Sequence, residues 1–437
     1  MKSIDKIPTS KLQRASKLVA TGAKVGVNYI KYYGDKLTKT EAEAKENLNQ
    51  NNAEDIYGSL KQLKGSALKV AQMLSMEKNI LPRAYVEKFS LAQFSVPPLS
   101  SPLVMKTFKK YFGESPSDIF DEFDPVSVGA ASIGQVHRAK KNGKPLAVKI
   151  QYPGVADSIK SDLAIVKPIA LRMFNIKGKD SDKYFKEVED KLTEETNYQL
   201  EIKQSKEIAD ACKHLQNIVF PVYYDEYSSS KILTMDFMEG EHLSDFVKHN
   251  KNIEKSNQLG QALWDFYMYQ IHHLKKVHAD PHPGNFLVNA NNQLVVLDFG
   301  CIKSIPDSFY VPYFELADPI ILNNPALFSE KLYELEILTP TDSSHEIEFF
   351  TDMFHELLSV FTRPFQNDIF DFSDPQFFNQ IGQLAEQYSQ NTDLRKFNSN
   401  RGSKHFIYMN RTFFGLYNLM FDLQANKIKI NQFEQYL

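Results

Sequence analysis

The chain has 437 residues, of which 42% are hydrophobic and 24% charged, enough to build two or three packed units with a sizeable core. Its net charge is −3, and no block of Lys or Arg could follow a phosphate backbone, which argues against nucleic-acid binding. Two cysteines, Cys212 and Cys301, are too few for a disulfide framework or a structural zinc site, so the sequence predicts a reducing compartment, the cytoplasm by default.

The N-terminal stretch predicts a basic amphipathic helix. Apolar residues recur at helical spacing with basic ones between them, at Leu12, Ala15, Leu18 and Val19. Two interpretations are equally supported: the helix lies on an anionic membrane surface, or it packs on its own domain. No apolar run approaches the roughly 20 residues that span a bilayer, and the start lacks the apolar core of a signal peptide. The sequence therefore predicts no transmembrane helix and at most peripheral contact with the inner face of a membrane.

A second helical pattern follows a charged stretch rich in Asn and Glu. Its apolar residues step by four and three from Ile56 to Leu74, which predicts one long helix with an apolar seam. Pro82 and the Pro97-Pro98 pair then interrupt helical patterning. We therefore expect residues 1–100 to form an N-terminal helical extension.

The middle of the chain predicts a small sheet with one long helix. Five strand-like runs occur, at 126–128, 136–138, 146–150, 218–223 and 231–235. Asn142-Gly143, between the second and third runs, is a strong hairpin signal because both turn residues must take positive φ. A helical pattern covers 184–213. Residues 101–240 are therefore expected to form one small lobe of sheet and helix.

The rest of the chain is mainly helical. Two short strands, 286–288 and 294–297, are predicted around a turn at Asn291-Asn292. The aromatic-rich helices downstream contain no recognisable motif. Residues 241–437 are expected to form the larger lobe with a helical C-terminal tail.

The strongest chemical signal lies next to these two strands. His278-Ala279-Asp280 has an Asn five residues past the Asp, and Asp298-Phe299-Gly300 follows an apolar strand, the layout of a kinase catalytic and metal-binding loop. Phosphoryl transfer mainly needs positioning and charge compensation. The predicted roles are a phosphate-binding cation, a glutamate that holds it, an acceptor-orienting carboxylate and two Mg²⁺ ligands: Lys149, Glu201, Asp280, Asn285 and Asp298. The predicted cofactors are ATP and Mg²⁺.

Each of these residues has a simpler explanation when taken alone. An isolated Asp-Phe-Gly is a common turn, and an isolated lysine on a strand is usually solvated, so only the ordered set is specific. His278 and His282 lie four apart and raise the alternative of a zinc site. Pro281 and Pro283 would break any helix that placed both histidines on one face.

Three segments together resemble the UbiB/AarF family of atypical kinases, namely Val128–His137, Ala147–Val155 and His278–Asn285. The resemblance extends from about Ile7 to at least Lys303. It implies an α+β, atypical protein-kinase-like two-lobe fold in which an alanine-rich loop replaces the usual glycine-rich loop. The nucleotide-binding residues that it implies, besides Lys149, are Gly129, Ala130, Ala131, Ser132, Gly134, Gln135, Val136, Met235, Asp236 and Met238.

The family's N-terminal extension carries a lysine-x-glycine-glutamine motif and folds over the active site. Lys69 and Gln72 match this motif, and Glu195 matches the glutamate of a second family motif. Glu195 and Glu201 lie six positions apart, so on one helix they would point to different sides. The resemblance therefore implies that Glu201 faces Lys149 while Glu195 faces Lys69. Without the resemblance, Lys69 and Gln72 would be interpreted as residues on the solvent-exposed face of a helix that packs in the core.

Three residues depart from the family pattern. Gly129 stands where the loop usually begins with alanine, Ala71 where the extension has glycine, and Asn197 where the family has aspartate. The first two change how closely backbone segments approach, and the third removes a negative charge. Inhibitory closure by the extension is therefore expected to be weaker in this chain.

The resemblance implies an ATP- and magnesium-dependent enzyme, an ATPase or small-molecule kinase rather than a protein kinase. Its expected role is to support isoprenoid quinone biosynthesis, of ubiquinone or menaquinone, or lipid handling at a membrane surface. Partners besides ATP would be an anionic membrane surface and quinone precursors or their biosynthetic complex. Two alternatives stay open: a catalytically weak, nucleotide-gated scaffold, and a true protein kinase whose Lys69 helix moves aside.

Overall fold

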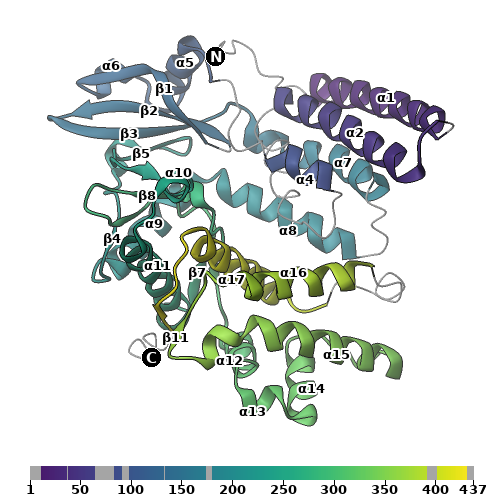
Figure 1. Cartoon of the computed structure of the whole chain (residues 1–437). Coiled ribbons are helices and arrows are strands. Elements are labelled where there is room, and N and C mark those ends of the chain that lie inside the picture. The colour runs from purple at the N-terminus through teal and green to yellow at the C-terminus, as the bar shows by residue number, and fades with distance from the viewer. Residues whose placement is uncertain are drawn as a thin grey trace. The chain divides into compact units, whose positions relative to one another are not determined.

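The computed structural model describes residues 11–36, 38–63, 83–90, 98–131, 133–173, 180–390 and 401–430. Helices and sheets are mixed, as expected for an α+β chain (Figure 1). Two compact units are present: one holds Met1–Lys203 with Val222–Phe237, and the other holds Gln204–Pro221 with Met238–Leu437. The chain thus passes between the units three times. The division into an extension and two lobes, with limits at residues 100 and 240, stays a prediction.

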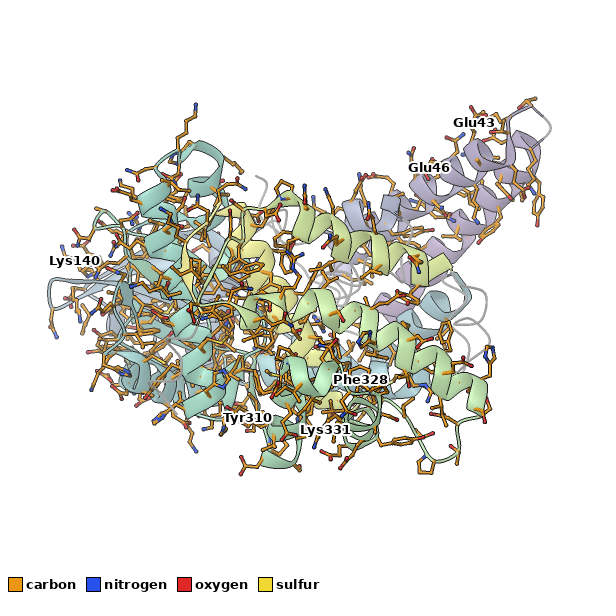
Figure 2. The ribbon with its side chains drawn as sticks, turned by 60° about the horizontal axis from the view of Figure 1, so that its bottom comes forward. Glu43, Glu46, Lys140, Tyr310, Phe328 and Lys331 are labelled. Atoms are coloured by element: carbon orange, nitrogen blue, oxygen red, sulfur yellow. The ribbon has the colours of Figure 1, made fainter. Side chains whose placement is uncertain are left out.

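The first unit opens with two helices that run side by side, α1 (Lys11–Asp35) and α2 (Glu41–Leu63) (Figure 1). A capping box precedes α2: Glu43, labelled in Figure 2, accepts hydrogen bonds from the backbone N–H and the hydroxyl of Thr40, and its own N–H donates to the Thr40 hydroxyl oxygen. The helices are antiparallel and pair through polar side chains, Thr21 with Ser59 and Asn28 with Asn52. A third helix, α4 (Arg83–Ser90), packs on α2.

Two predictions for this region fall partly outside the described residues. The helix predicted from Ile56 to Leu74 is described as far as Leu63, where α2 ends. The side chains of Leu12, Ala15, Leu18 and Val19 also lie outside the described set, although the backbone of α1 is helical there.

An antiparallel sheet of four strands forms the centre of the first unit, in the order β1-β2-β3-β5. Its strands are β1 (Glu122–Ala131), β2 (Gly134–Lys141), β3 (Lys144–Gln151) and β5 (Ile232–Asp236). The predicted hairpin joins β2 to β3, with φ of 50° at Asn142 and 76° at Gly143. The left-handed conformation of both residues suits the twist of the strands. Two helices precede the sheet, α5 (Ser101–Phe112) and α6 (Pro116–Ile119).

The prediction of a fifth strand in this sheet is wrong. Only Ile218–Val219 of the run forms a strand, β4, and it pairs in parallel with β9 of the second unit. Pro221, two residues after Val219, lacks the N–H that a longer strand would need. Tyr223 then makes a single bridge to Met235 of β5.

The prediction of one continuous helix over 184–213 is also wrong. Three helices follow β3: α7 (Val155–Met173), α8 (Asp180–Glu195) and α9 (Tyr198–Cys212). The break between α8 and α9 falls at Thr196-Asn197, where the Asn197 Oδ1 accepts a hydrogen bond from Leu200 N at 3.2 Å. Asn197 therefore caps α9 as a new helix.

The second unit contains a four-stranded sheet in the order β4-β9-β8-β6 and a two-stranded ladder of β10 with β7. The predicted strands at 286–288 and 294–297 are β8 (Phe286–Val288) and β9 (Leu294–Val296), joined by a turn in which Asn292 has a φ of 57°. The other elements before residue 305 are β6 (Glu241–His242), α10 (Leu243–His249), α11 (Ile253–Met268), a π-turn (Tyr269–His273), β7 (Lys276–His278) and β10 (Ile302–Ser304).

Helices with many aromatic side chains complete the second unit. Their bounds are α12 (Asp307–Glu315), α13 (Pro319–Leu322), α14 (Pro325–Glu334), α15 (Ser344–Phe361), α16 (Pro375–Gln390) and α17 (Lys404–Asp422), with the short pair β11 (Ile369–Phe370) and β12 (Ile428–Lys429). Lys331 of α14, labelled in Figure 2, lies 2.8 Å from Glu315 of α12, and this ion pair ties the two helices together. Arg401 is buried against Asp342 at 2.6 Å, directly before α17.

Candidate active site residues

Lys149 lies on β3, the strand that pairs with both β2 and β5. Its Nζ is 2.7 Å from Oε1 of Glu201, in the first turn of α9. The side chains are 11% and 5% exposed, so salt screens this pair little. A carboxylate is also favoured at a helix N-terminus by the helix dipole. The first unit therefore brings these two predicted residues together.

Tyr198 supports this pair from the start of α9. The Lys149 Nζ lies 5.2 Å from the centre of its ring, within the range of a cation–π contact. A Cβ at Gly134 would lie 2.4 Å from Ile150 O and 3.0 Å from the Tyr198 hydroxyl. Gly134, predicted to contact nucleotide, therefore also allows β2 to start close to β3 and Tyr198.

The break between α8 and α9 sets the position of Glu201. The Thr196 carbonyl, at the C-terminal end of α8, accepts hydrogen bonds from Gln151 Nε2 and Lys231 Nζ, both at 3.1 Å. Burial lowers the pKa of Lys231. The last residue of β3 and the residue before β5 thereby hold the point from which α9 begins. Glu195 and Glu201 consequently lie on different helices, rather than on two sides of one.

The predicted phosphate loop connects β1 to β2. Gly129, Ala130 and Ala131 pair with Val136, Gln135 and Gly134, respectively, while Ser132 lies outside the described residues. A Cβ at Gly129 would meet nothing within 4 Å, so the alanine that the family usually has there would fit without displacing this protein's own atoms.

The Gln135 side chain points into the protein interior. Its Oε1 accepts a hydrogen bond from Leu99 N at 2.6 Å, and its Nε2 lies 2.7 Å from His137 Nε2. Burial lowers the pKa of His137, which favours a neutral ring. With Nδ1–H donating to Asp124 O at 2.9 Å, Nε2 is the acceptor for Gln135. The predicted nucleotide contact of Gln135 is therefore left to its backbone.

The end of β5 and the residues after it are also predicted to contact nucleotide. The Asp236 carboxylate accepts hydrogen bonds from the Tyr224 hydroxyl at 2.7 Å and Val222 N at 3.1 Å, and it lies 3.0 Å from Lys144 Nζ. Met235 is buried at the end of β5, and Met238 is half-buried at the start of the second unit. The Asp236 carboxylate is thus engaged within the protein and holds this segment in place. A nucleotide would therefore contact the backbone of the segment rather than the Asp236 side chain.

In the second unit, β7 leads into the loop that contains Asp280. The Asp280 carbonyl accepts hydrogen bonds from His282 N at 2.7 Å and from Asn285 Nδ2 at 3.0 Å. Because the Asn285 amide group donates here, its Oδ1 turns away from the bond, and amide oxygens are ligands that Mg²⁺ accepts. His278 lies on a strand and His282 in a turn, so the two histidines share no helix face.

Asp298 belongs to the same hydrogen-bonded framework. Its Oδ1 accepts a hydrogen bond from Gly300 N at 2.7 Å. Leu297 N donates to Asn285 O at 3.0 Å, and Ala279 N donates to the Cys301 carbonyl at 2.8 Å. Both motifs are therefore tied to each other by their backbones. The donor set of one carboxylate and one amide fits Mg²⁺, which usually takes one or two protein carboxylates together with substrate phosphates.

Two residues that support this loop were missed by sequence reasoning. Gln270 is fully buried in the π-turn, and its Oε1 accepts a hydrogen bond from His278 N at 3.0 Å. The Tyr267 hydroxyl lies 3.5 Å from His278 Nδ1. Burial, together with the charge of nearby Asp280, raises the pKa of Tyr267 well above its ordinary value. The sequence signal that could have revealed Gln270 was a single glutamine within an aromatic and apolar run. Short π-helical segments such as this one are frequent beside functional sites.

The regulatory extension is only partly described. Lys69, Ala71 and Gln72 lie outside the described residues, and Glu195 is buried at the end of α8. Its pairing with Lys69 stays a prediction. Asn197 is exposed and caps α9, a position at which Asn and the family's aspartate are about equally favourable.

Residues 91–330, more than half of the chain, match the family model described as the ABC1 atypical kinase-like domain. The chain belongs to this family. The matched part of this ABC1 domain includes Lys149, Glu201, Asp280, Asn285 and Asp298. The UbiB/AarF resemblance and the kinase-like α+β fold are therefore confirmed.

Two relatives indicate how far the similarity of the ABC1 chain extends. It is 30% identical over 305 residues to Protein ACTIVITY OF BC1 COMPLEX KINASE 8, chloroplastic, of Arabidopsis thaliana, which covers 67% of this chain and 40% of that protein. It is 28% identical over 386 residues to Atypical kinase COQ8, mitochondrial, of Saccharomyces cerevisiae, which covers 86% of this chain and 75% of that one. The chain therefore spans less than half the length of its chloroplastic relative.

A solved structure supports the fold of the ABC1 chain. The complex of Rv3197 with erythromycin from Mycobacterium tuberculosis aligns with a TM-score of 0.59 and 22% sequence identity. The alignment covers 91% of this chain and 98% of that one. At this identity the likeness shows a shared fold.

Proposed function

We propose that this ABC1-family chain binds ATP with Mg²⁺ and transfers or hydrolyses the terminal phosphoryl group. The observation that carries the proposal is the Lys149–Glu201 contact of 2.7 Å. A lysine held in this way presents a fixed positive charge to the α and β phosphates. Because both side chains are buried, an opposite charge on a bound phosphate would act in a medium of low dielectric constant.

The second unit holds the other residues with proposed roles. Asn285 Oδ1 and the Asp298 carboxylate would hold Mg²⁺, and the Asp280 carboxylate would orient or deprotonate the acceptor hydroxyl. Bound Mg²⁺ would offset charge on the phosphate oxygens. The hydrogen bond from Asn285 Nδ2 to Asp280 O fixes the position of the metal-binding Asn285 relative to the acceptor-orienting Asp280. Positioning of this kind supports most of the rate gain expected in phosphoryl transfer.

The acceptor is proposed to be water or a small molecule. The family resemblance implies an extension over the site at which a protein substrate would dock, which disfavours a protein kinase. The resemblance to UbiB kinases and the match to the mitochondrial atypical kinase COQ8 support a role in isoprenoid quinone biosynthesis.

A membrane surface is the proposed place of action, and α1 supports it. Thr21 and Asn28 are buried against α2, whereas Val27, Ile30 and Tyr33 are 50%, 73% and 66% exposed. Residues three positions apart lie on the same face of a helix. The exposed side chain of Lys31 accompanies them, whereas Lys24, also exposed, pairs with Asp55 of α2 at 3.5 Å. A helix that turns polar residues inward and apolar and basic ones outward suits an anionic lipid surface. None of the helices in the described ranges has the length and hydropathy that spanning a bilayer requires.

Replacing Asp298 tests the catalytic proposal. Asp298→Asn removes one charge from the metal site, so ATP turnover should fall by about 100-fold or more while the unfolding midpoint stays near that of the wild type. Phosphate release and urea unfolding measure the two effects. Asp352→Asn, an exposed site on α15, is the matched control and should change neither. If the wild type binds nucleotide but releases no phosphate, the result would contradict the enzyme proposal and favour a nucleotide-gated scaffold. Phosphorylation of a peptide would favour a protein kinase.

Co-sedimentation with vesicles tests the membrane proposal. Ile30→Asp places a charge in the exposed apolar row, so binding to vesicles of phosphatidylglycerol and phosphatidylcholine should weaken about threefold or more. Asn51→Asp puts the same charge on an exposed position of α2 and should have a smaller effect. Equal weakening by both variants would show that charge alone, rather than the apolar row, governs binding. ATP turnover with and without the vesicles tests whether the surface affects the chemistry.

A further inference from the structure

Helix α17 touches the Asp280 loop at a glycine. A Cβ at Gly415 would lie 2.4 Å from Cγ and 3.3 Å from Cβ of Pro281, and 3.4 Å from the Pro281 carbonyl oxygen. Real Cβ atoms do not approach other atoms as closely as 2.4 Å, and the proline ring can move little on its own backbone. Glycine at 415 is therefore what lets the loop lie against α17.

Pro281 is joined to the residues with predicted catalytic roles. The carbonyl of the Asp280–Pro281 peptide accepts hydrogen bonds from His282 N at 2.7 Å and Asn285 Nδ2 at 3.0 Å. Because peptide units are planar, a shift of the Pro281 ring rotates this carbonyl as well. Displacement at Pro281 would thus move the Asp280 backbone and turn the Asn285 amide.

The position of α17 is fixed independently of this contact. The Tyr408 hydroxyl donates to Ser304 O of β10 at 2.8 Å. Past the C-terminal end of α17, a Cβ at Gly260 of α11 would lie 2.8 Å from Ala425 Cβ. Trp264 Nε1 donates to the Ile430 carbonyl at 3.2 Å. A helix held before and after residue 415 cannot yield easily to a new side chain, so the loop would have to move instead.

We propose that Gly415 is a positioning residue for the Asp280–Asn285 loop, acting through Pro281. This inference rests on the proposed ATP chemistry, because it assigns Gly415 to the geometry of that site. It extends the functional unit beyond residues 91–330, the part that matches the family model. Gly415 itself touches neither substrate nor metal in this proposal.

The test compares glycine-to-alanine changes in two helices. Gly415→Ala should lower kcat for ATP turnover about tenfold or more and raise the Mg²⁺ concentration needed for half-maximal rate, because Asn285 loses its orientation. Nucleotide affinity measured without Mg²⁺ should stay within about twofold, since the phosphate-binding Lys149 lies in the other unit. Gly382→Ala on α16, where a Cβ meets nothing within 4 Å, is the matched control and should leave all these quantities unchanged.

A second-site change separates positioning from general damage. In a Pro281→Ala background the ring Cγ is absent, so the same substitution at 415 should reduce kcat only about twofold. An equal loss in both backgrounds overturns the proposal, as does a wild-type rate for Gly415→Ala. If Gly415→Ala does not fold, recovery of folding in the double variant supports the contact, and failure to recover overturns it.

Hydrogen exchange gives a readout that does not need turnover. Peptides covering residues 278–300 should exchange faster in Gly415→Ala than in Gly382→Ala, and the Pro281→Ala background should reverse the change. Absence of ATP turnover in the wild type would defeat the proposed function, whereas this comparison would still decide whether Gly415 positions the loop. Unchanged exchange in Gly415→Ala would refute the positioning role.

Discussion

Among single residues, Asp265 of α11 should make the stability of the second unit depend on pH. Burial raises the pKa of its carboxyl group from 3.8 to about 6, although Gln261 Nε2 donates a hydrogen bond to it at 2.9 Å. The folded-state pKa lies above the unfolded one, so this group's contribution to stability is present below about pH 4 and is lost as pH rises through about 6. At neutral pH the fold must hold a partly buried charge there.

Asp265→Asn should therefore stabilise the protein above about pH 7 and have little effect near about pH 4. A shift of two pKa units corresponds to about 3 kcal/mol, and partial exposure reduces the expected gain in unfolding free energy to about 1–2 kcal/mol. Urea unfolding at both pH values measures it. The exposed Asp352→Asn should show no such dependence. A gain of equal size at both pH values would contradict the assignment to Asp265 ionisation.

Functional residues could be predicted from the sequence where they belong to short local motifs. Asp280, Asn285 and Asp298 lie in two short motifs, and Lys149 follows an apolar run, so their types and spacing were informative. Gly415 could not be found in this way, because its role depends on a contact with a ring far away in the chain. Glycine in a helix has no single meaning until its neighbours in space are known.

At the scale of elements, the break between α8 and α9 should control the Lys149–Glu201 pair. Gln151→Met removes a buried donor to the Thr196 carbonyl and leaves Lys231 to satisfy it alone. We expect a loss of about 1–3 kcal/mol in unfolding free energy and weaker nucleotide binding, because α9 loses part of its anchor. Chemical denaturation and nucleotide titration measure the two effects.

Gln199→Met is the matched control for that change. Gln199 is exposed on the first turn of α9, so the same substitution there should leave stability within about 0.5 kcal/mol of the wild type. Similar losses from both substitutions would show that the Thr196 hydrogen bond is not what holds the start of α9.

The sequence pattern could not reveal this break. Apolar spacing continues through residues 184–213, and Thr196-Asn197 contains neither Gly nor Pro. The local signal was Asn197, a favourable N-cap residue, and one such residue does not distinguish the start of a new helix from the continuation of the old one. The break depends on Gln151 at the end of β3 and on Lys231 directly before β5, both far from it in the sequence. The Asn142-Gly143 hairpin, in contrast, was predicted because its turn residues alone define its geometry.

For the whole molecule, family resemblance predicted the kinase-like fold, whereas local patterns predicted most strands and the helical C-terminal region. The assignment of Ile218–Val219 to the first sheet was wrong because a two-residue strand has no periodicity by which to recognise its partner. Parallel pairing with β9 is a long-range contact, and sequence patterns carry little information about such contacts. The same holds for Gly260 against Ala425.

The repeated passage of the chain between its two units should affect how the protein folds during its synthesis on the ribosome. The first unit cannot be completed until Phe237 has been synthesised, and β4 must wait for Leu294–Val295, its partner in β9. At usual elongation rates that delay is on the order of several seconds. During this interval the nascent chain presents an apolar segment with unsatisfied backbone groups, so translation speed and chaperone access should influence the yield of correctly folded protein.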